Sequence, residues 1–415
     1  MNLILIMKGK VMNNDVAITG SAITGTWGNF FQFLLQELKP RGPWLTPFNI
    51  ISIPVILTGA VILVYRFIYG LGSVTNLSQE TPWGLWMGFD VVTGVALAGG
   101  AYVITFVVYV MKVDKYHGIV RITVLNGFLA YAFYGAALLF DLGRPWNGPN
   151  PYIGNSFGFS SVLFLICWHF LLYMIAQLVE FSPVIAEWLH WEKAKRILTK
   201  LTIGTVILGI TLSILHQSGL GALFLMAKPK IHPLWWSQFI PILFFVSSIY
   251  AGLAMIIVEG TISHSVFKRL IPASHHHHWN DIIFGLAKGA AITMFVYYFF
   301  KALLFIHDKQ WDLLVDGWGL WYLLEVIGFV LIPALMFAFG FKHRSLNIIK
   351  IAAVMALVGI ILNRLNVSVI SFNWYADVHY FPTWQEIVVT LMVVFSELWV
   401  FRWAATRMPV FDSDH

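Results

Sequence analysis

Ten long apolar stretches follow one another along the chain, separated by short polar loops. Each is close to or above the roughly 20 residues that a helix needs to cross the hydrocarbon core of a membrane. The pattern therefore predicts an all-α polytopic membrane protein with about ten transmembrane helices. The predicted spans are residues 49–71, 84–112, 119–141, 157–180, 198–216, 239–262, 281–305, 318–341, 347–371 and 385–404.

A shorter apolar segment precedes the first span. Residues 26–38 have the spacing of a short amphipathic helix, which would either lie on the membrane surface or only lead into the first span. The start of the chain, MNLILIMKGK, lacks the charge-first pattern of a cleaved secretory signal. We therefore expect a cytoplasmic N-terminal segment over 1–48, a transmembrane domain over 49–404 and a cytoplasmic tail over 405–415.

Composition supports the membrane assignment and excludes several other classes. Hydrophobic residues make up 59% of the chain and charged residues only 11%, too few to cover a soluble domain of this size. The single cysteine, Cys167, excludes a disulfide framework and a cysteine-ligated iron–sulfur cluster, which takes about four thiolates. The net charge of +6 fits basic loops between spans better than a nucleic-acid partner, because the basic residues are spread out.

The loops on the two sides of the predicted bundle differ in charge. Those on the side of the N-terminus contain 18 Lys and Arg residues, whereas those on the opposite side contain 5. The positive-inside rule then places both termini in the cytoplasm, and the even number of spans agrees. The opposite loops are rich in Trp and Pro, as in TPWGLW and HPLWWS. They indicate either an aromatic belt at the membrane surface or a docking face for a periplasmic partner.

Ionisable side chains inside the spans are the most informative residues, because a charge at the membrane centre costs at least about 2.5–3.5 kcal/mol. The direction of each span places one polar group in the outer half of the membrane, composed of Asp90, Asp141, Arg144, His216, Gln217, Glu325, Asn363 and Arg364. A second, smaller group lies toward the cytoplasm and comprises Glu180, Glu259 and Lys288. Asp141 and Arg144 could alternatively form only a local ion pair, and Lys288 could reach the headgroups.

A quinone head group could use the outer group of residues. Its two carbonyls accept hydrogen bonds, and its reduction takes two electrons and two protons, which nearby acids and a histidine can supply. We expect His216 to hydrogen-bond a quinone carbonyl, with Asp90 or Asp141 holding the other ring nitrogen.

Haem and metal sites are less favoured by the pattern. A haem b needs two histidines at matching depth on facing helices, whereas His169 falls in the middle of its span and His216 at the outer end of the next. The tract His275–His278 fits a solvated cytoplasmic loop better than a metal site. We therefore expect no haem and no metal cluster in this chain.

Ten motifs, in order, resemble the NrfD/PsrC superfamily, and within it the HybB-type membrane subunits of periplasm-facing [NiFe] hydrogenases. The resemblance runs from about Ile50 to Arg402. The motifs are GLGSV at 70–74, PWGLWMGFD at 82–90, HGIVR at 117–121, DLGRPWN at 141–147, SVLF at 161–164, VEFSP at 179–183, HQSGLGAL at 216–223, HPLWWS at 232–237, VEG at 258–260 and YFPTWQE at 380–386.

The resemblance implies two four-helix bundles with two added helices in a bacterial or archaeal inner membrane. It implies a site for menaquinone or ubiquinone near the outer face, without a bound redox cofactor. Electrons would pass through a periplasmic, ferredoxin-like iron–sulfur subunit, fed by a [NiFe] hydrogenase, a multihaem cytochrome c or a molybdopterin enzyme. The implied quinone-binding residues are Asp90, Asp141, Arg144, His216 and Gln217. The resemblance also implies that Glu259 belongs to a proton route from the cytoplasm. The polar residues inside the spans add Glu180 as a second candidate for that route, and His169, Glu325, Asn363 and Arg364 as possible supporting residues of the quinone site.

One position departs from the resemblance. Hydrogenase-type members typically carry an acid directly after the SVLF motif, where this chain has Leu165. His169 is the candidate substitute, because it lies four residues further on and on the same helix face. This difference leaves three alternative partners for the subunit: a hydrogenase, a multihaem cytochrome c and a molybdopterin enzyme.

Two other function classes share some of these sequence features. A secondary transporter also has many spans with buried charges, but it usually shows Gly- or Pro-broken spans in corresponding halves. A passive membrane anchor has no need of Asp90, Glu325 and Arg364 inside its spans.

Overall fold

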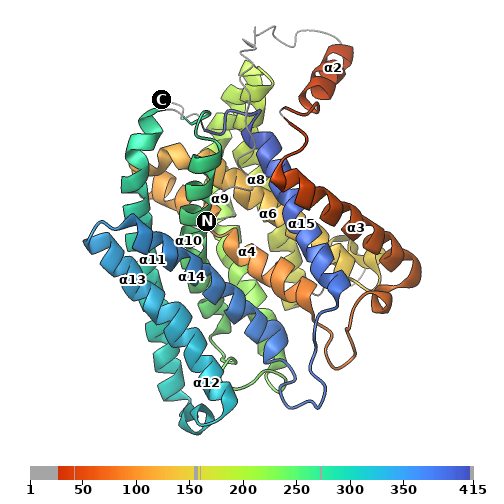
Figure 1. The fold of residues 1–415 in the computed structure, drawn as a ribbon, viewed down its shortest axis with the longest axis vertical. Helices are drawn as coiled ribbons and strands as arrows, with labels where there is room; N and C mark the ends of the chain where they lie inside the picture. The colour runs from red at the N-terminus through yellow and green to blue at the C-terminus, as the bar shows by residue number, and fades with distance from the viewer. Residues whose placement is uncertain (1–26, 42, 154–157, 159, 272, 412–415) are drawn as a thin grey trace.

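The computed structural model describes residues 27–41, 43–153, 158, 160–271 and 273–411. Within these ranges the chain is almost entirely helical, apart from an isolated β-bridge between Ile231 and Phe372. Ten helices in the described part of the chain are long and apolar enough to cross a membrane, which confirms the number of spans that the hydropathy pattern predicts. Figure 1 shows them as an inclined bundle of mostly long helices.

The first half of the chain contains five spans and a preceding helix, α2 (Trp27–Glu37). The spans are α3 (Pro47–Tyr69); the consecutive segments η2 (Trp86–Thr93), α4 (Gly94–Leu97), α5 (Gly100–Thr105) and η3 (Phe106–Val110); η4 (Asp114–Ile119) with α6 (Val120–Asp141); α8 (Val162–Trp188); and α9 (Glu192–Leu223) with η6 (Phe224–Ala227). A short helix, α7 (Asn150–Ile153), lies between α6 and α8.

The second half contains the other five spans. They are α10 (Ile240–Val266); α11 (Ala273–His307); α12 (Gly317–Leu323) with η8 (Leu324–Leu331) and α13 (Ile332–Lys342); α14 (Leu346–Leu365) with η9 (Asn366–Ile370); and α15 (Trp384–Ala405). The segments η2, η3, η8 and η9 are π-helical, a wider coil that often marks functional sites.

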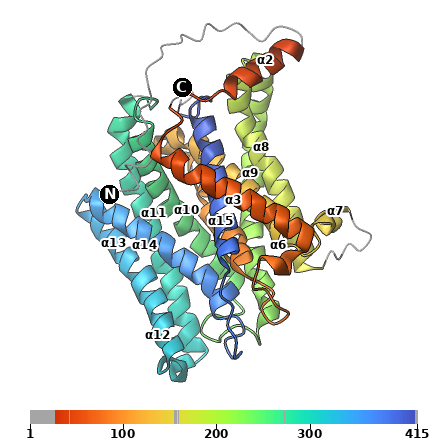
Figure 2. The same ribbon diagram turned by 45° about the vertical axis from the view of Figure 1, so that its right-hand side comes forward.

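The spans form two bundles and an added pair. In the first bundle, the span η2–η3 packs with α6, α8 and α9; in the second, α10, α11, α13 and α14 pack together. The outer helices α3 and α15 lie against each other beside the first bundle, as Figures 1 and 2 show. Trp399 Nε1 on α15 donates to Ser52 Oγ on α3 at 2.9 Å.

Small residues allow the two bundles to touch. A Cβ atom at Gly252 of α10 would lie 2.2 Å from the backbone nitrogen of Gly100, and one at Gly99 would lie 2.6 Å from the Ser248 carbonyl oxygen. Any larger side chain at Gly252 would therefore push the backbones of the two bundles apart. Close backbone approach of this kind is typical of small residues at helix contacts in membranes.

The bundle has two ends that differ in composition. We call the end with the connections before Pro47, between Val110 and Asp114, and after Ala405 the terminal face. The opposite end, which includes α7, α12 and the loop before Trp384, is the aromatic face. The helix α2 lies at the terminal face, where the Glu37 carbonyl oxygen accepts hydrogen bonds from Arg407 Nε at 2.6 Å and Trp403 Nε1 at 3.1 Å.

Three predicted boundaries are wrong. The helix α9 extends to Leu223, so His216 lies inside it and not at its outer end. Lys301, which the count of basic residues assigns to the loop 301–317, is instead 6% exposed within α11, because α11 continues to His307. The tract His275–His278 lies in the first turns of α11 and not in a loop, although the side chains of residues 275–277 fall outside the described ones.

Candidate functional site

Asp90 is completely buried in the π-helical segment η2, about one turn from its beginning at the aromatic face. Its Oδ2 atom accepts a hydrogen bond from Thr390 Oγ1 of α15 at 3.1 Å. Its Oδ1 atom has no hydrogen-bond partner among the described residues. A buried carboxyl with one free oxygen is unusual, because buried polar atoms are nearly always paired.

Asp141 ends α6 and is half-buried, and its Oδ1 atom also has no hydrogen-bond partner in the described part of the chain. The nearby cation is Arg66 of α3, which is 2% exposed and interacts electrostatically with Asp141. The Arg66 guanidinium donates through Nε to the Phe140 carbonyl oxygen at 2.8 Å and also bonds the Leu142 carbonyl oxygen. Arg66 therefore fixes the end of α6 where Asp141 lies.

The first turn of α15 closes this region at the aromatic face. Glu386 and Thr383 form a capping box, and Glu386 accepts a hydrogen bond from the Tyr380 hydroxyl. Trp86 Nε1 of η2 donates to the Glu386 carbonyl oxygen at 3.1 Å. Burial raises the pKa of Tyr380 above its ordinary value, which keeps this hydroxyl a donor.

The acidic junction is our name for the set Arg66, Asp90, Asp141, Glu386 and Thr390, contributed by α3, η2, α6 and α15. It brings together two of the residues predicted for the quinone site. A third, Arg144, is exposed, and among the described residues it makes no ion pair with Asp141. The alternative of a local Asp141–Arg144 ion pair is therefore wrong.

His216 lies apart from these acids, on α9. Its Nδ1 atom is 3.3 Å from the Ile166 carbonyl oxygen of α8, and its ring lies 5.6 Å from that of Tyr131 and 5.9 Å from that of Phe170. The expectation that Asp90 or Asp141 holds this imidazole is wrong, because a backbone carbonyl occupies one nitrogen and the other has no described partner. The neighbouring Gln217 donates through Nε2 to the Val95 carbonyl oxygen at 2.7 Å.

His169 and His216 lie near each other on the adjacent helices α8 and α9. The predicted mismatch of their depths is wrong, because α9 continues past His216. A haem, however, needs both imidazoles to face a flat slot of their own. The 2% exposed His216 ring instead packs against Tyr131 and Phe170, so these residues do not fit a haem. In the described part of the chain, no group of three or more His, Cys, Asp or Glu residues is arranged to hold a metal ion.

Glu325 of η8 belongs to a separate network in the second bundle. Its Oε2 atom accepts from Trp235 Nε1 at 2.6 Å and from Asn366 Nδ2 at 2.5 Å, and its Oε1 atom accepts from Asn363 Nδ2 at 2.7 Å. The acid and the two asparagines are buried. All three donors therefore converge on one carboxylate.

Arg364 extends this network. Its guanidinium donates to Ser247 Oγ at 2.8 Å, the Phe244 carbonyl oxygen at 3.2 Å and Asn363 Oδ1 at 2.9 Å. The buried Lys301 interacts electrostatically with Glu325. The structure thus separates the predicted supporting residues of the second bundle from the acidic junction.

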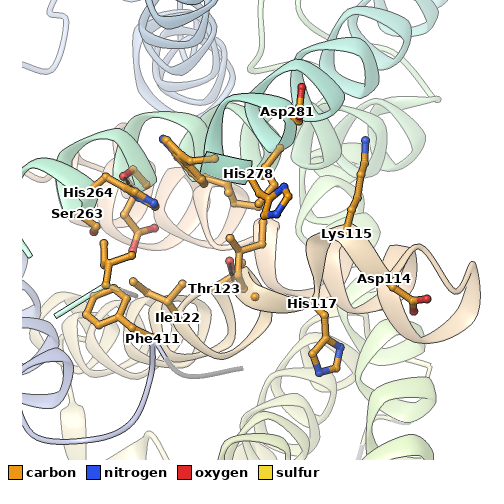
Figure 3. A pocket seen from close by; sticks show the side chains of 18 residues that line it. Asp114, Lys115, His117, Ile122, Thr123, Ser263, His264, His278, Asp281 and Phe411 are labelled. Carbon is orange, nitrogen blue, oxygen red and sulfur yellow. Dashed lines mark hydrogen bonds between the residues drawn. The ribbon is translucent and has the colours of Figure 1, made fainter. Parts of the chain in front are cut away.

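A cavity of about 750 Å³ opens near the terminal face between α6, α10 and α11. Figure 3 shows His264 and Ser263 of α10 at one end of it and Lys115 and Asp114 at the other. Glu259 lines this cavity and accepts a hydrogen bond from Asn126 Nδ2 at 2.6 Å.

The two predicted acids on this side, Glu180 and Glu259, each have one buried carboxyl oxygen without a partner among the described residues. Glu180 is half-buried on α8, and the cavity that Glu259 lines does not include it. The cavity therefore supports an access route to Glu259 and leaves Glu180 beside it.

Several residues were not identified as site residues from the sequence. Around the first bundle and the helix pair beside it, they are Arg66, Tyr134, Thr390 and Glu397; in the second bundle, the residue is Lys301. Glu397 carried a usable signal, because it is an acid within the apolar stretch MVVFSELWV. The others carried none, because a Thr, a Tyr or a basic residue near a span end has no evident partner until the helices are placed.

The chain matches known proteins over most of its length. The family model described as "Polysulphide reductase, NrfD" covers residues 73–376, which leaves α3 and α15 outside the match. A protein of Nitratidesulfovibrio vulgaris is 40% identical over 378 residues, covering 91% of this chain and 97% of the relative. The probable Ni/Fe-hydrogenase 2 b-type cytochrome subunit of Escherichia coli is 28% identical over 371 residues, 87% of this chain and 93% of the relative. A selenate reductase subunit of Mesobacillus selenatarsenatis is 23% identical over 247 residues, 51% of this chain and 54% of the relative.

Proposed function

This chain belongs to the NrfD family of membrane subunits of respiratory oxidoreductases, and we propose that its acidic junction binds the membrane quinone. The observation that carries the proposal is the pair of carboxyl oxygens, Asp90 Oδ1 and Asp141 Oδ1, that lack described partners at one end of the bundle. A protonated carboxyl there can donate a hydrogen bond to a quinone carbonyl and later its proton. The Arg66 guanidinium beside Asp141 favours negative charge on a reduced head group.

Each quinone takes up two electrons and two protons to become the quinol. The chain's own residues hold the head group and move the protons, whereas the electrons come from or go to a partner. Asp90 and Asp141 are the binding residues that geometry supports best. Three other predicted residues would act from outside the acidic junction. Arg144 would do so from the exposed segment after α6, and His216 and Gln217 through the packing of α9 against α4.

Protons would reach the acidic junction from the terminal face. The cavity beside Glu259 gives water a path to a buried carboxyl, and Glu180 lies on the neighbouring helix α8. We place the terminal face in the cytoplasm of a bacterial or archaeal inner membrane, because the basic residues concentrate there. An alkaline phosphatase fusion after residue 411 should be inactive; an active one would reverse this orientation.

The electron partner would dock on the aromatic face. Exposed rings there include Trp146, Trp311, Phe381 and Trp384. Aromatic residues of this kind anchor protein interfaces. The relatives named as subunits of a Ni/Fe-hydrogenase and a selenate reductase support a redox enzyme as the partner. We infer an iron–sulfur subunit, linked to a [NiFe] hydrogenase, a multihaem cytochrome c or a molybdopterin enzyme, because a chain with one cysteine cannot hold a cluster.

The test uses the purified complex with two electron acceptors. The variant Asp90→Asn should lower the reduction of a soluble quinone at least about 100-fold, because it removes a group that donates and transfers a proton. Reduction of viologen by the partner subunit should stay at the wild-type rate. Asp312→Asn, an exposed acid on the same face, is the matched control and should leave both rates unchanged.

The other candidate functions give different results. A passive anchor would show normal quinone reduction in an assembled Asp90→Asn complex, which would overturn the proposal. A reduced-minus-oxidised spectrum with a b-type band from the isolated subunit would show that the chain also holds haem.

A further inference from the structure

Four ionisable side chains form a sequence between the cavity at the terminal face and the acidic junction. They are Glu259 of α10, Glu397 of α15, Tyr134 of α6 and Asp90 of η2. Glu397, Tyr134 and Asp90 are 8%, 8% and 0% exposed, so neither bulk water nor lipid headgroups can compensate their polar atoms. Three different helices and a π-helical segment contribute to this one line.

The positions of these residues along their helices give their order in depth. At a rise of about 1.5 Å per residue, Glu259 lies about 10 Å from the terminal end of α10 and Glu397 about 12 Å from that of α15. Tyr134 lies about 10 Å from the opposite end of α6 by the same rise, and Asp90 lies closer still to the aromatic face. The line therefore advances across the membrane from one residue to the next.

Electrostatic interactions and helix packing relate the members of the line. Glu397 interacts electrostatically with Glu259, and the helix that carries it, α15, packs against α6, which carries Tyr134. Tyr134 interacts electrostatically with Glu397 and with Asp90. The Tyr134 ring also packs on Gly94, one turn after Asp90, where a Cβ atom would lie 2.4 Å from the ring. Gly94 thus leaves room for the tyrosine beside the acid.

The tenth span, α15, holds two of the relevant side chains on one face. On α15, Thr390 bonds Asp90 at 3.1 Å, and Glu397 lies seven residues, or two turns, further toward the terminal face. The two side chains therefore project from nearly the same side of α15, toward η2 and α6. By contrast, Leu165, where resembling subunits carry an acid, is exposed on α8.

We propose that Glu397 and Tyr134 carry protons between Glu259 and Asp90, so that α15, which lies outside the NrfD match, completes the proton route. In each transfer, the carboxyl of Glu259 gives a proton to the carboxylate of Glu397. Tyr134 then takes that proton on its oxygen while its own O–H bond breaks and a new O–H bond forms on Asp90. One proton moves and no electron is transferred. This inference rests on the proposed quinone site at Asp90.

The test compares Glu397→Gln and Tyr134→Phe with a matched control, in the intact complex reconstituted in vesicles. Both variants keep side-chain volume but cannot relay a proton. Quinone reduction should fall at least about tenfold in each, while viologen reduction by the partner stays unchanged. The control Ser52→Ala removes the hydrogen bond from Trp399 of α15 and should keep the wild-type quinone rate, since it loosens α15 without touching the relay.

A merely structural role for Glu397 gives different readouts. A relay predicts that Glu397→Asp regains part of the rate and that azide, a small weak acid, restores turnover to Glu397→Gln. Structural damage predicts neither. Normal turnover in Glu397→Gln, or loss without rescue by azide or by Asp, would overturn the relay. If Asp90→Asn is still inactive in that case, the quinone site stands alone; if Asp90→Asn is also normal, the quinone site fails as well.

Discussion

The two helix bundles begin one of their spans with the same four residues but use the acid that follows in different ways. In the first bundle, WGLW at 83–86 leads to Asp90; in the second, WGLW at 318–321 leads to Glu325. Each acid lies four residues after the second tryptophan of its motif and is completely buried in a π-helical segment. The two positions are therefore equivalent in local sequence and local backbone.

Their surroundings differ. Three donors saturate Glu325, and two buried cations, Arg364 and Lys301, lie near it. Among the described residues, Asp90 receives one hydrogen bond, from the Thr390 hydroxyl, and acids outnumber cations around it. A saturated buried network fixes a packing arrangement, whereas a buried acid with a free oxygen is retained where it has something to bind or transfer. The difference indicates a structural acid in the second bundle and a chemical one in the first.

The largest expected effect separates the two acids by stability. Glu325→Ala would leave Trp235, Asn363 and Asn366 without an acceptor and Arg364 without a nearby anion, at a cost of about 3–5 kcal/mol. We expect the complex to lose its assembled form on fluorescence-detected size exclusion, whereas Asp90→Ala should assemble. Glu325→Gln, which keeps an acceptor, should assemble with reduced thermal stability and normal quinone turnover. An assembled Glu325→Gln complex as inactive as Asp90→Asn would remove the distinction between the bundles.

An intermediate effect is expected at Arg66, which links the stability and the chemistry of the first bundle. Arg66→Gln removes charge-assisted hydrogen bonds to the end of α6, worth about 1.5–3 kcal/mol. We expect a lower midpoint of thermal unfolding together with slower quinone reduction, because Asp141 loses its neighbouring cation. Arg344→Gln, an exposed arginine at the terminal face, is the control. Unchanged quinone kinetics in Arg66→Gln would restrict this residue to packing.

The smallest effect concerns pH and lies outside the membrane spans. Burial lowers the pKa of His232 below its ordinary value of 6.5, and its Nδ1 atom accepts from the Leu234 backbone N–H at 3.3 Å, which requires a neutral ring. Its contribution to stability is therefore full above pH 6.5 and declines as the pH falls toward the folded pKa. His232→Gln should flatten the pH dependence of thermal unfolding on the acid side of about pH 6.5. An unchanged slope there would assign the acid sensitivity to other groups.

The sequence predicted the architecture well because membrane spans are read from one-dimensional hydropathy. All ten spans appear, and Asp90 and Glu259 could be identified because an acid in an apolar stretch is conspicuous. The end of α9 was missed because helical hydrogen bonds continue into the less apolar stretch HQSGLGAL. Hydropathy predicts the part of a helix that crosses the membrane, but it does not predict where the helix ends.

The partners of these residues could not be predicted, because depth alone does not say which helices face each other. Asp90 and His216 were expected to meet, but they belong to different helix contacts: Asp90 to α15 and His216 to α8. The repeated WGLW was present in the sequence, yet only the three-dimensional surroundings show that Asp90 and Glu325 differ.

The most direct test of the quinone site at the acidic junction is photolabelling with an azido-quinone in the assembled complex, followed by peptide mapping. The account predicts labelled peptides from η2, the end of α6 and the first turns of α15, with labelling suppressed by excess quinone and reduced in Asp90→Asn. Specific labelling of the second bundle around Glu325, or of the cavity beside Glu259, with none at the acidic junction, would contradict it.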